Sequence, residues 1–202
     1  HCGDDGPVNE IALDVRGDMV VEPDGGILVA EANRVARITT DGRVETVAGL
    51  GTCDGDCCGD GGPATDATFG NLAAMALGDD GTLYVLDTDR DCESVRAIGS
   101  DGIIRRVAFD PLRDETIAGE GGSALEASPG APSGLAVGPD GALYISAWYY
   151  HVIRGVGTDG ILRRFAGNGT GGFDGDGGPA VEAMLNEPWD MATGLRGDDY
   201  VV

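Results

Sequence analysis

The stretch "FDGDGGPAVEAMLNEPWDM", residues 173–191, follows a pattern that recurs along the chain. A close copy, "CCGDGGPATDATFGNLAAM", begins at Cys57, and "HCGDDGPVNEIALDVRGDM" fills residues 1–19. A more degenerate copy, "GEGGSALEASPGAPSGLAV", fills residues 119–137. We call this segment the Asp-Gly phrase. Its spacing of 56, 60 and 56 residues indicates a repeat protein. The glycines that open the four copies are Gly3, Gly59, Gly119 and Gly175.

The same series of segments follows each copy of the phrase. Two short apolar runs flank a turn such as "GDDGT" or "GPDGA", and two further runs flank a second Asp-Gly turn. Asp-Gly between alternating apolar segments is a strong signal of a β-hairpin. Each unit is therefore predicted to form four antiparallel strands, a to d, with no helix longer than two turns. Serial four-stranded units are typical of a β-propeller. The fourth run, "ILRRFAG", mixes arginine with apolar residues and is expected to be an exposed edge strand.

The predicted fold class is therefore all-β, with about three and a half propeller blades in one region, residues 1–202. The chain begins before strand a, so its first residues are not expected to supply the strands missing from the last unit. A partial propeller, or an arc completed by something else, is the expected architecture. Residues 199–202 are predicted to form a second strand with an open outer edge. The approximate units are 3–58, 59–118, 119–174 and the incomplete 175–202.

The charge of the chain limits its partners. There are 35 acidic and 13 basic residues, which gives a net charge of −22. Nucleic acids and anionic membranes are bound largely through lysine and arginine, so neither is expected as a partner. No apolar run approaches the roughly 20 residues of a membrane span. An acidic surface instead favours cations and basic partners.

Three segments carry a family resemblance: "NGTGGFDGDGGPAVEAMLNEPWDMATG", "GLAVGPDGALYIS" and "HVIRGVGTDGILRRFAGNG". They resemble NHL-repeat β-propellers, of the kind common in extracellular and secreted bacterial proteins. The resemblance covers essentially the whole chain. His151 falls where that repeat usually has an Asn-His pair, here Tyr150-His151, and is expected to be a packed family position. The resemblance implies the fold and leaves the function open among binding modules, sensor domains and, rarely, enzymes.

The cysteines point to an oxidising compartment. Cys53, Cys57 and Cys58 lie in the loop that enters the second unit, and Cys92 lies between strands b and c of that unit. In a four-stranded blade these two loops emerge on the same face. Disulfides are favoured over a zinc site, because adjacent cysteines seldom both bind one ion and Cys-x₃-Cys-Cys is not a usual zinc spacing. Cys92 is expected to bond Cys57 or Cys58, and Cys2 has no obvious partner in its unit.

The aspartates of the phrases form two clusters that could bind a cation. Calcium takes oxygen ligands from aspartates and backbone carbonyls in glycine-rich loops. No bidentate glutamate follows at the spacing of a known calcium loop. The alternative, which we favour, is that these side chains build the turns and cap backbone N–H groups. Structural calcium is the one cofactor that these residues suggest. The candidate ligands are Asp54, Asp56, Asp60, Asp174 and Asp176.

The aromatic run Trp148, Tyr149 and Tyr150 lies in a loop between strands b and c. Binding residues concentrate on such loops of rigid scaffolds, so these residues are the candidate binding site. The alternative is that they pack against the next blade, since aromatic side chains bury much apolar area. The expected partner on this loop face is a protein or a carbohydrate, with further copies of the same chain as a third candidate.

Two functions of different class follow. The leading hypothesis is a non-enzymatic binding or structural module of a larger bacterial protein, located outside the cell, on its surface or in the periplasm. The alternative is a metal-dependent propeller enzyme, a lyase or hydrolase. The sequence holds only two histidines, His1 and His151, whereas the amidating-lyase enzymes of this fold hold zinc with several. An enzyme would therefore need ligands from outside this sequence.

Overall fold

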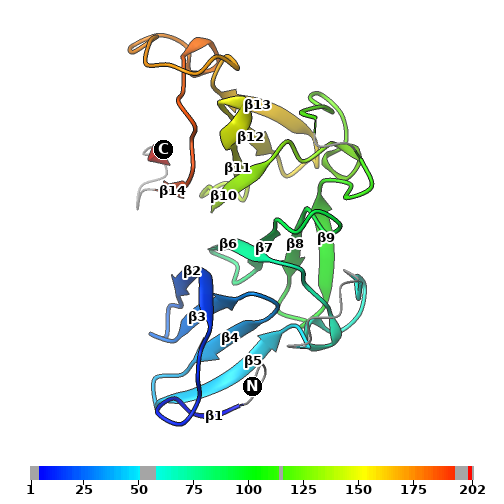
Figure 1. The fold of residues 1–202 in the computed structure, drawn as a ribbon, viewed down its shortest axis with the longest axis vertical. Coiled ribbons are helices and arrows are strands. Elements are labelled where there is room, and N and C mark those ends of the chain that lie inside the picture. The colour runs from blue at the N-terminus through cyan, green and yellow to red at the C-terminus, as the bar shows by residue number, and fades with distance from the viewer. Residues whose placement is uncertain (1–4, 51–57, 114–115, 194–199, 202) are drawn as a thin grey trace.

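A computed structural model describes residues 5–50, 58–113, 116–193 and 200–201. The protein is all-β, as predicted: three antiparallel sheets, the first of five strands and the next two of four, follow one another along the chain, and a two-stranded sheet follows the third (Figure 1). Each sheet is one blade, numbered 1 to 4. Within the described residues, the helical elements are 3₁₀ turns of three residues each. No helix in this part of the chain is long and apolar enough to cross a membrane.

The strands of each blade pair in sequence order, and each begins and ends close to the apolar runs of the sequence. Blade 1 contains β2 (Val15–Val21), β3 (Ile27–Glu31), β4 (Val35–Ile38) and β5 (Arg43–Ala48), with β1 (Gly6–Pro7) added outside β5. Blade 2 contains β6 (Leu72–Leu77), β7 (Leu83–Asp87), β8 (Ser94–Ile98) and β9 (Ile104–Ala108). Blade 3 contains β10 (Pro132–Val137), β11 (Leu143–Ala147), β12 (Val152–Val156) and β13 (Leu162–Ala166), and blade 4 contains β14 (Ala192–Thr193) and β15 (Tyr200–Val201).

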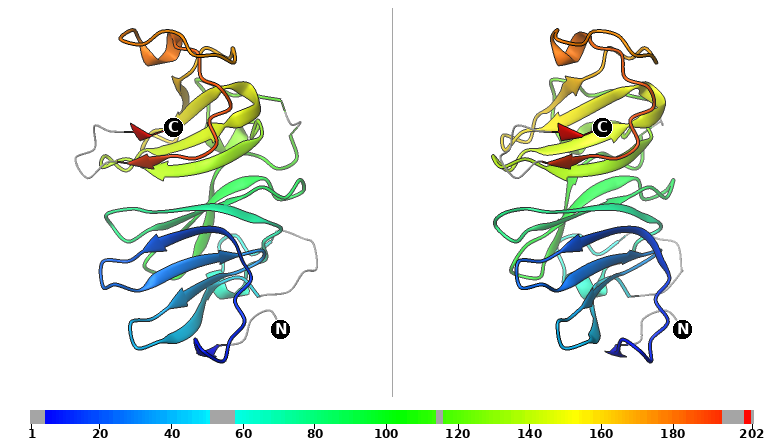
Figure 2. Two further views of the ribbon diagram at one scale, coloured as in Figure 1. Left: turned by 60° about the vertical axis from the view of Figure 1, so that its left-hand side comes forward. Right: turned by 90° about the vertical axis from the view of Figure 1, so that its left-hand side faces the viewer.

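The blades are arranged as in a propeller, with strand a of each on the inner side. β6 contacts both β2 and β10, and β10 contacts β14. Figure 1 shows these four strands along one side of the arc, while β5, β9 and β13 lie farther out. The two views of Figure 2 show the blades stacked on one another. The inner strands therefore bring segments about 60 residues apart in sequence close together.

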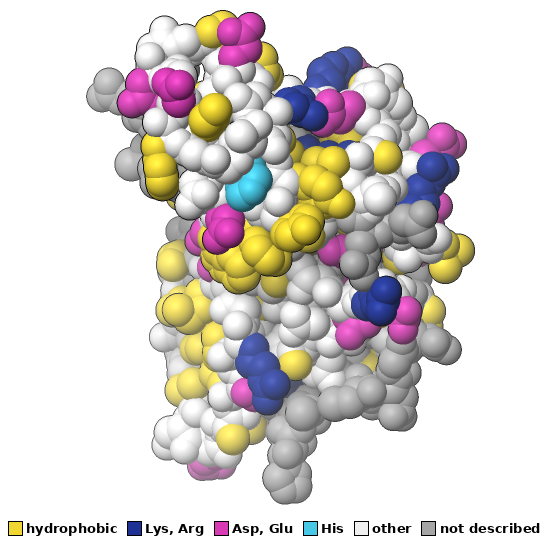
Figure 3. Space-filling model, turned by 45° about the horizontal axis from the view of Figure 1, so that its top comes forward, with side chains coloured by type: hydrophobic (Ala, Val, Ile, Leu, Met, Phe, Trp, Pro, Cys, Tyr) yellow, Lys and Arg dark blue, Asp and Glu magenta, His cyan; other side chains and the backbone are white. Residues whose placement is uncertain are grey.

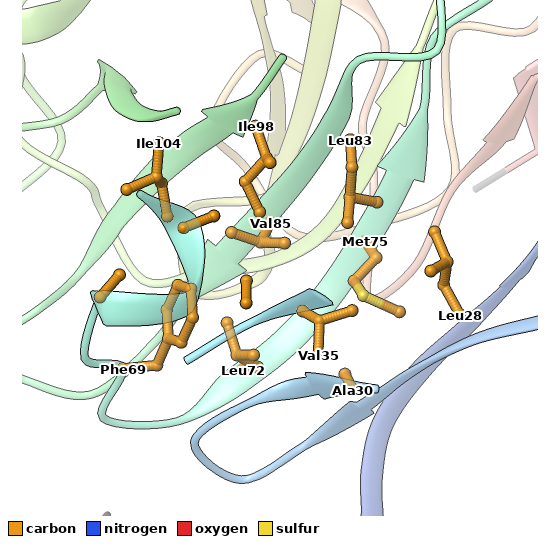
Figure 4. Packing of buried hydrophobic residues seen from close by; sticks show 13 residues of the cluster. Leu28, Ala30, Val35, Phe69, Leu72, Met75, Leu83, Val85, Ile98 and Ile104 are labelled. Atoms are coloured by element: carbon orange, nitrogen blue, oxygen red, sulfur yellow. The ribbon is translucent and has the colours of Figure 1, made fainter. Parts of the chain in front are cut away.

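The hydrophobic core lies between neighbouring blades. Leu28 and Val35 of blade 1 pack against Met75 and Val85 of blade 2, and all four are at most 3% exposed (Figure 4). Separate clusters join blade 2 to blade 3 and blade 3 to the start of blade 4. Each side chain of this size contributes about 1.5–3 kcal/mol when it is fully buried. Each sheet of the repeat therefore covers the apolar face of its neighbour.

The Asp-Gly phrase links the outer strands of two successive blades, which explains why it recurs. The N–H of Gly49, after β5, donates to the carbonyl of Ala64 in the 3₁₀ turn η1 (Ala64–Asp66) (2.9 Å). The N–H of Ala64 donates in turn to the carbonyl of Gly102, before β9 (2.8 Å). One blade further on, the same bonds join Phe109 to Ala124 (2.8 Å) and Ala124 to Gly160 (2.9 Å). β9 and β13 are the edge strands of their sheets, as predicted, and the phrase of the same unit pairs only at the start of each. In blade 1 the prediction is wrong, because β1 pairs with β5.

The first glycine of the phrase is required by both its dihedral angle and its packing. Gly59, Gly119 and Gly175 have φ of +104°, +95° and +98°. A Cβ on Gly119 would lie 2.7 Å from the Cα of Ala127, closer than real Cβ atoms approach. Positive φ costs an L-residue roughly 1–2 kcal/mol even without a clash. The glycine thus lets the phrase fold tightly against the alanine that follows its 3₁₀ turn.

The fourth phrase keeps its bonds to blade 3. The N–H of Gly167 donates to the carbonyl of Ala180 in η4 (Ala180–Glu182) (2.9 Å). Ala64 and Ala124, at the same place in earlier phrases, are buried at 2% and 0%, whereas Ala180 is exposed. Within the described residues β15 pairs only with β14, and residues 199 and 202 of the predicted last strand lie outside that part. Among the described residues, the fourth phrase therefore has no strand d of its own unit beside it.

Buried arginines of strand c hold the phrases in place. Arg96 in β8 is 3% exposed; its guanidinium donates to the carbonyls of Thr68 (2.9 Å) and Cys58 (3.1 Å) and to Asp60 Oδ1 (3.0 Å). It also lies over the ring of Phe69, 5.0 Å from the centroid. Arg154 in β12 makes the corresponding bonds to the carbonyls of Ser128, Pro129 and Ala118. Burial lowers the pKa of Arg154 to about 10, so it stays charged at neutral pH.

Candidate functional site

The predicted aromatic run forms the 3₁₀ turn η3 (Trp148–Tyr150), which joins β11 to β12. The ring centroids of Trp148 and Tyr149 lie 5.7 Å apart, and those of Tyr149 and Tyr150 lie 5.3 Å apart, both in edge-to-face geometry. Tyr149 is 63% exposed. The turn therefore presents an aromatic ring to solvent on the loop face of blade 3.

A second tryptophan from a distant part of the sequence joins this cluster. Trp189 precedes β14, and its ring centroid lies 5.6 Å from that of Trp148 with an interplanar angle of 53°. It is 64% exposed. The sequence prediction missed Trp189. Alignment of the phrases gives the signal that could have found it, because Trp189 occupies an inner-strand position that is small in the other three units. Those equivalent residues are Gly17, Ala73 and Ser133.

Hydrogen bonds to blade 3 hold Trp189 beside Trp148. The N–H of Glu187 donates to Nδ1 of His151, the residue after η3 (3.1 Å). The hydroxyl of Ser133 donates to the carbonyl of Pro188 (3.2 Å), and the hydroxyl of Ser146 donates to the carbonyl of Trp189 (3.3 Å). His151 thus accepts a bond that fixes the tryptophan segment.

The backbone around the cluster is strained. Among the described residues, the non-glycine residues with positive φ are Phe109 and three residues at this cluster: Ala131 (+51°), His151 (+54°) and Glu187 (+53°). Ala131 and Glu187 occupy the same repeat position, just before strand a. Non-glycine residues rarely adopt this conformation, and such strain gathers at functional sites. The strain supports a binding role for this part of the surface.

Three adjoining cavities run along the cluster, and we call them together the aromatic groove. Their volumes are about 610, 410 and 280 Å³. Trp148 lines the first and second, and Trp189 lines the second and third. Figure 3 shows hydrophobic side chains gathered beside the histidine on this face. The groove therefore extends from η3 toward the inner strand of blade 1. Its polar lining residues include Thr88, Arg90, Glu93, Thr116, Asn71 and Arg16.

The charges along the groove are mixed in sign. Asp18 and Asp190 line the third cavity. Burial raises the pKa of Asp18; the N–H groups of Met19 and Met75 oppose the rise, and the nearby Asp190 adds to it. Arg16 lines the same cavity and forms an ion pair with Asp14 (2.8 Å). The groove thus has carboxylates and guanidinium groups side by side.

The structure describes only part of the predicted cysteine site. Cys92 is buried at 1% exposure and belongs to a disulfide. Cys58 is an exposed free thiol, so it is not the partner of Cys92 in this structure. Cys53 and Cys57, like Cys2, lie outside the described residues. The bond between Cys92 and the 53–57 segment therefore stays a prediction.

The predicted cation ligands are not brought together where they are described. Asp60 is paired with Arg96 (3.0 Å), and Asp174 Oδ1 accepts the N–H of Gly175 (2.8 Å). Asp176 lies with Asp174 in the fourth phrase, far from Asp60 in the sequence. In the described ranges, no three His, Cys, Asp or Glu side chains are grouped so that they could hold a metal. Asp54 and Asp56 lie outside those ranges, so the calcium hypothesis stays a prediction there.

Sequence comparison finds relatives that are much longer than this chain. Mouse Teneurin-3 is 31% identical over 153 residues, which cover 69% of this chain and 6% of the relative. The chain thus spans about 6% of the length of the curated relatives it matches. No protein-family model matches the sequence.

Comparison with solved structures gives the fold. An auxiliary nutrient binding protein from Bacteroides thetaiotaomicron matches with a TM-score of 0.59 and 16% identity, over 90% of this chain and 43% of that one. A streptogramin B lyase matches with a TM-score of 0.56 and 11% identity, over 96% and 49% of the two chains. At such identities the match concerns the fold alone. The chain therefore has the β-propeller fold, built from units that resemble NHL repeats.

Proposed function

We propose that this chain is part of a non-enzymatic binding module that acts outside the cytoplasm and holds its ligand in the aromatic groove. One observation carries the proposal. Tyr149 and Trp189 are exposed large aromatic side chains, and they come from two different blades to one groove. Exposed aromatic side chains that gather in a hollow are typical of binding sites.

The way in which the groove is built supports the same proposal. A surface that only happened to be apolar would not need strained residues or dedicated hydrogen bonds. Here His151 and Glu187 both have positive φ, and they are bonded to each other. Strain of about 1–3 kcal/mol per residue persists when the surrounding structure compensates for it, most often at sites of function.

The chemistry of the groove favours binding over catalysis. The described residues that line its three cavities include neither a histidine nor a cysteine. The nearby His151 already uses Nδ1 to accept the N–H of Glu187. A location outside the cytoplasm is supported by the disulfide of Cys92, because cytoplasmic thiols are kept reduced.

Arrays of glycans and peptides test the proposal. A fluorescent tetramer of the chain is applied to both arrays, beside a Tyr149→Ala/Trp189→Ala double variant. Phe173→Ala is the matched control, because Phe173 is 91% exposed and does not line the groove. We expect signals that the double variant loses and the control keeps. Equal signals from the double variant, or chemical conversion of a bound compound, would contradict the proposal.

A further inference from the structure

We propose that the aromatic groove binds a neutral oligosaccharide, with sugar rings stacked on Trp148, Tyr149 and Trp189. This inference rests on the proposed function and names the class of ligand. It follows from four properties of the groove: the placement of its rings, the kinds of hydrogen-bonding group along it, its local charge and its length.

The rings provide stacking surfaces of the right kind. A pyranose ring carries C–H groups on its faces and hydroxyls around its edge, so it can cover an aromatic face while its rim stays hydrated. Tyr149 and Trp189 are each more than 60% exposed and retain free ring surface. Trp148 is tilted by 75° to Tyr149 and by 53° to Trp189. Successive units of a glycan are turned relative to one another, so tilted rings suit a chain better than a single flat ligand.

The polar lining requires a ligand that both donates and accepts hydrogen bonds. Thr88, Thr116 and Ser133 carry hydroxyls, which can do either. Glu93 and Asp190 are carboxylates, which only accept when ionised. Sugar hydroxyls meet both needs. A proline-rich peptide, another ligand that aromatic-lined grooves take, lacks an N–H donor at each proline and offers mainly carbonyls.

The local charge favours a neutral ligand. Two guanidinium groups, of Arg16 and Arg90, line the groove together with three carboxylates, of Asp18, Glu93 and Asp190. The two guanidinium groups offset two of the three carboxylates, so the groove itself carries little net charge for an ionic ligand to pair with. The net charge of −22 repels an anionic ligand over the whole surface. An uncharged chain of sugars avoids this repulsion, and arginine and carboxylate side chains can bond its neighbouring hydroxyls.

The shape of the groove favours several sugar units. Thr88, Ala131 and Trp148 line both the first and the second cavity, and Arg16, Ser133 and Trp189 line both the second and the third. The three cavities are therefore one continuous groove that passes four blades. Each is near the lower or middle range of a small-ligand pocket, roughly 300–1,000 Å³. A linear oligosaccharide fills such a groove, whereas a single sugar would occupy only one cavity.

Isothermal titration calorimetry and tryptophan fluorescence test the inference on the full chain. Trp148 and Trp189 are the two tryptophans of the sequence, so the fluorescence reports on the groove alone. The neutral probes are cellohexaose, xylohexaose, mannohexaose and chitohexaose. The comparison probes are a heparin hexasaccharide, a proline-rich decapeptide and an oligolysine peptide. The variants are Trp189→Ala and Tyr149→Ala, with Phe173→Ala as the control.

We expect at least one neutral hexasaccharide to bind and to change the fluorescence. Its affinity should fall by about tenfold or more in each groove variant, stay unchanged in Phe173→Ala, and vary little with salt, because no ion pair is involved. Binding that survives both groove variants, or no binding by any neutral probe, overturns the inference. If a peptide or heparin alone binds and needs Trp189, the oligosaccharide is wrong and the proposed function stands. If no probe of any class binds through the groove, both fail.

Discussion

The rings of Trp148 and Trp189 lie 5.6 Å apart, although 41 residues separate them in the sequence and they belong to successive blades. Two indoles this close and tilted by 53° couple their electronic transitions. We therefore expect a paired positive and negative band in the far-ultraviolet circular dichroism spectrum near the main indole absorption. The couplet should disappear in both Trp148→Phe and Trp189→Phe. The difference between the wild-type spectrum and that of each single variant gives the contribution of one tryptophan. If these two contributions add up to the whole wild-type indole signal, the two rings are not coupled and the contact is contradicted.

Much of the fold could be predicted from the Asp-Gly turns and the alternating apolar runs, because these are local signals. The aromatic turn after β11 was also predicted, since its three residues are adjacent. Trp189 was missed because its role depends on the packing of blade 4 against blade 3. The pairing of each of the first three phrases with the strand d of its own unit was missed for a similar reason: backbone bonds such as that from Ala64 to Gly102 leave no trace in side-chain type. The link between Asp60 and Arg96 spans 36 residues and likewise needed the structure.

Arg96 should be one of the largest single contributors to the stability of blade 2. Arg96→Ala removes three hydrogen bonds from a buried guanidinium and its contact with Phe69. We expect a loss of at least about 2 kcal/mol in the free energy of unfolding, because bonds to charged groups contribute about 1.5–3 kcal/mol each. Urea denaturation measures it. The control is Arg105→Ala, which breaks an exposed pair with Asp101 and should lower the free energy of unfolding far less. Equal effects would show that Arg96 does not hold the phrase.

Two glycines of the third phrase separate steric from conformational effects. Gly119 and Gly121 have φ of +95° and +81°. A Cβ at Gly119 would meet Ala127 at 2.7 Å, whereas nothing lies within 4 Å of one at Gly121. Gly121→Ala should lower the free energy of unfolding by about 1–2 kcal/mol, because alanine disfavours this positive φ even without a clash. Gly119→Ala should cost a further 1–3 kcal/mol or so, because the added methyl overpacks the contact. Thermal unfolding of the two variants measures the difference, and equal losses would contradict the tight packing of the phrase.

The raised pKa of Asp18 predicts a pH dependence of stability. Below the ordinary value of 3.8, Asp18 is protonated in both the folded and the unfolded chain. As the pH rises from 3.8 towards the raised pKa, the unfolded chain releases this proton before the folded chain does. The free energy of unfolding therefore falls over this range and stays lower above it. We expect the stability of Asp18→Asn, relative to wild type, to improve between pH 4 and neutrality.

Asp80 gives the matched control with the opposite sign. Its pKa is lowered by bonds from the N–H and hydroxyl of Thr82, so its contribution is present above 3.8 and is lost as the pH falls through the lowered value. Asp80→Asn should therefore lose stability relative to wild type as the pH rises from below 3.8. Urea titrations across the pH range measure both variants. The same trend in both would contradict the assignment for Asp18.

We expect this propeller to bind its ligand in the groove between Trp148 and Trp189. Nuclear magnetic resonance of the indole N–H groups tests it directly, because the chain gives two such signals and both come from the groove. We expect a neutral hexasaccharide to move both indole signals together, with one saturation curve, and to leave the backbone N–H signal of Phe173 unmoved. Binding that leaves both indole signals in place, while backbone signals on another face shift, would contradict it.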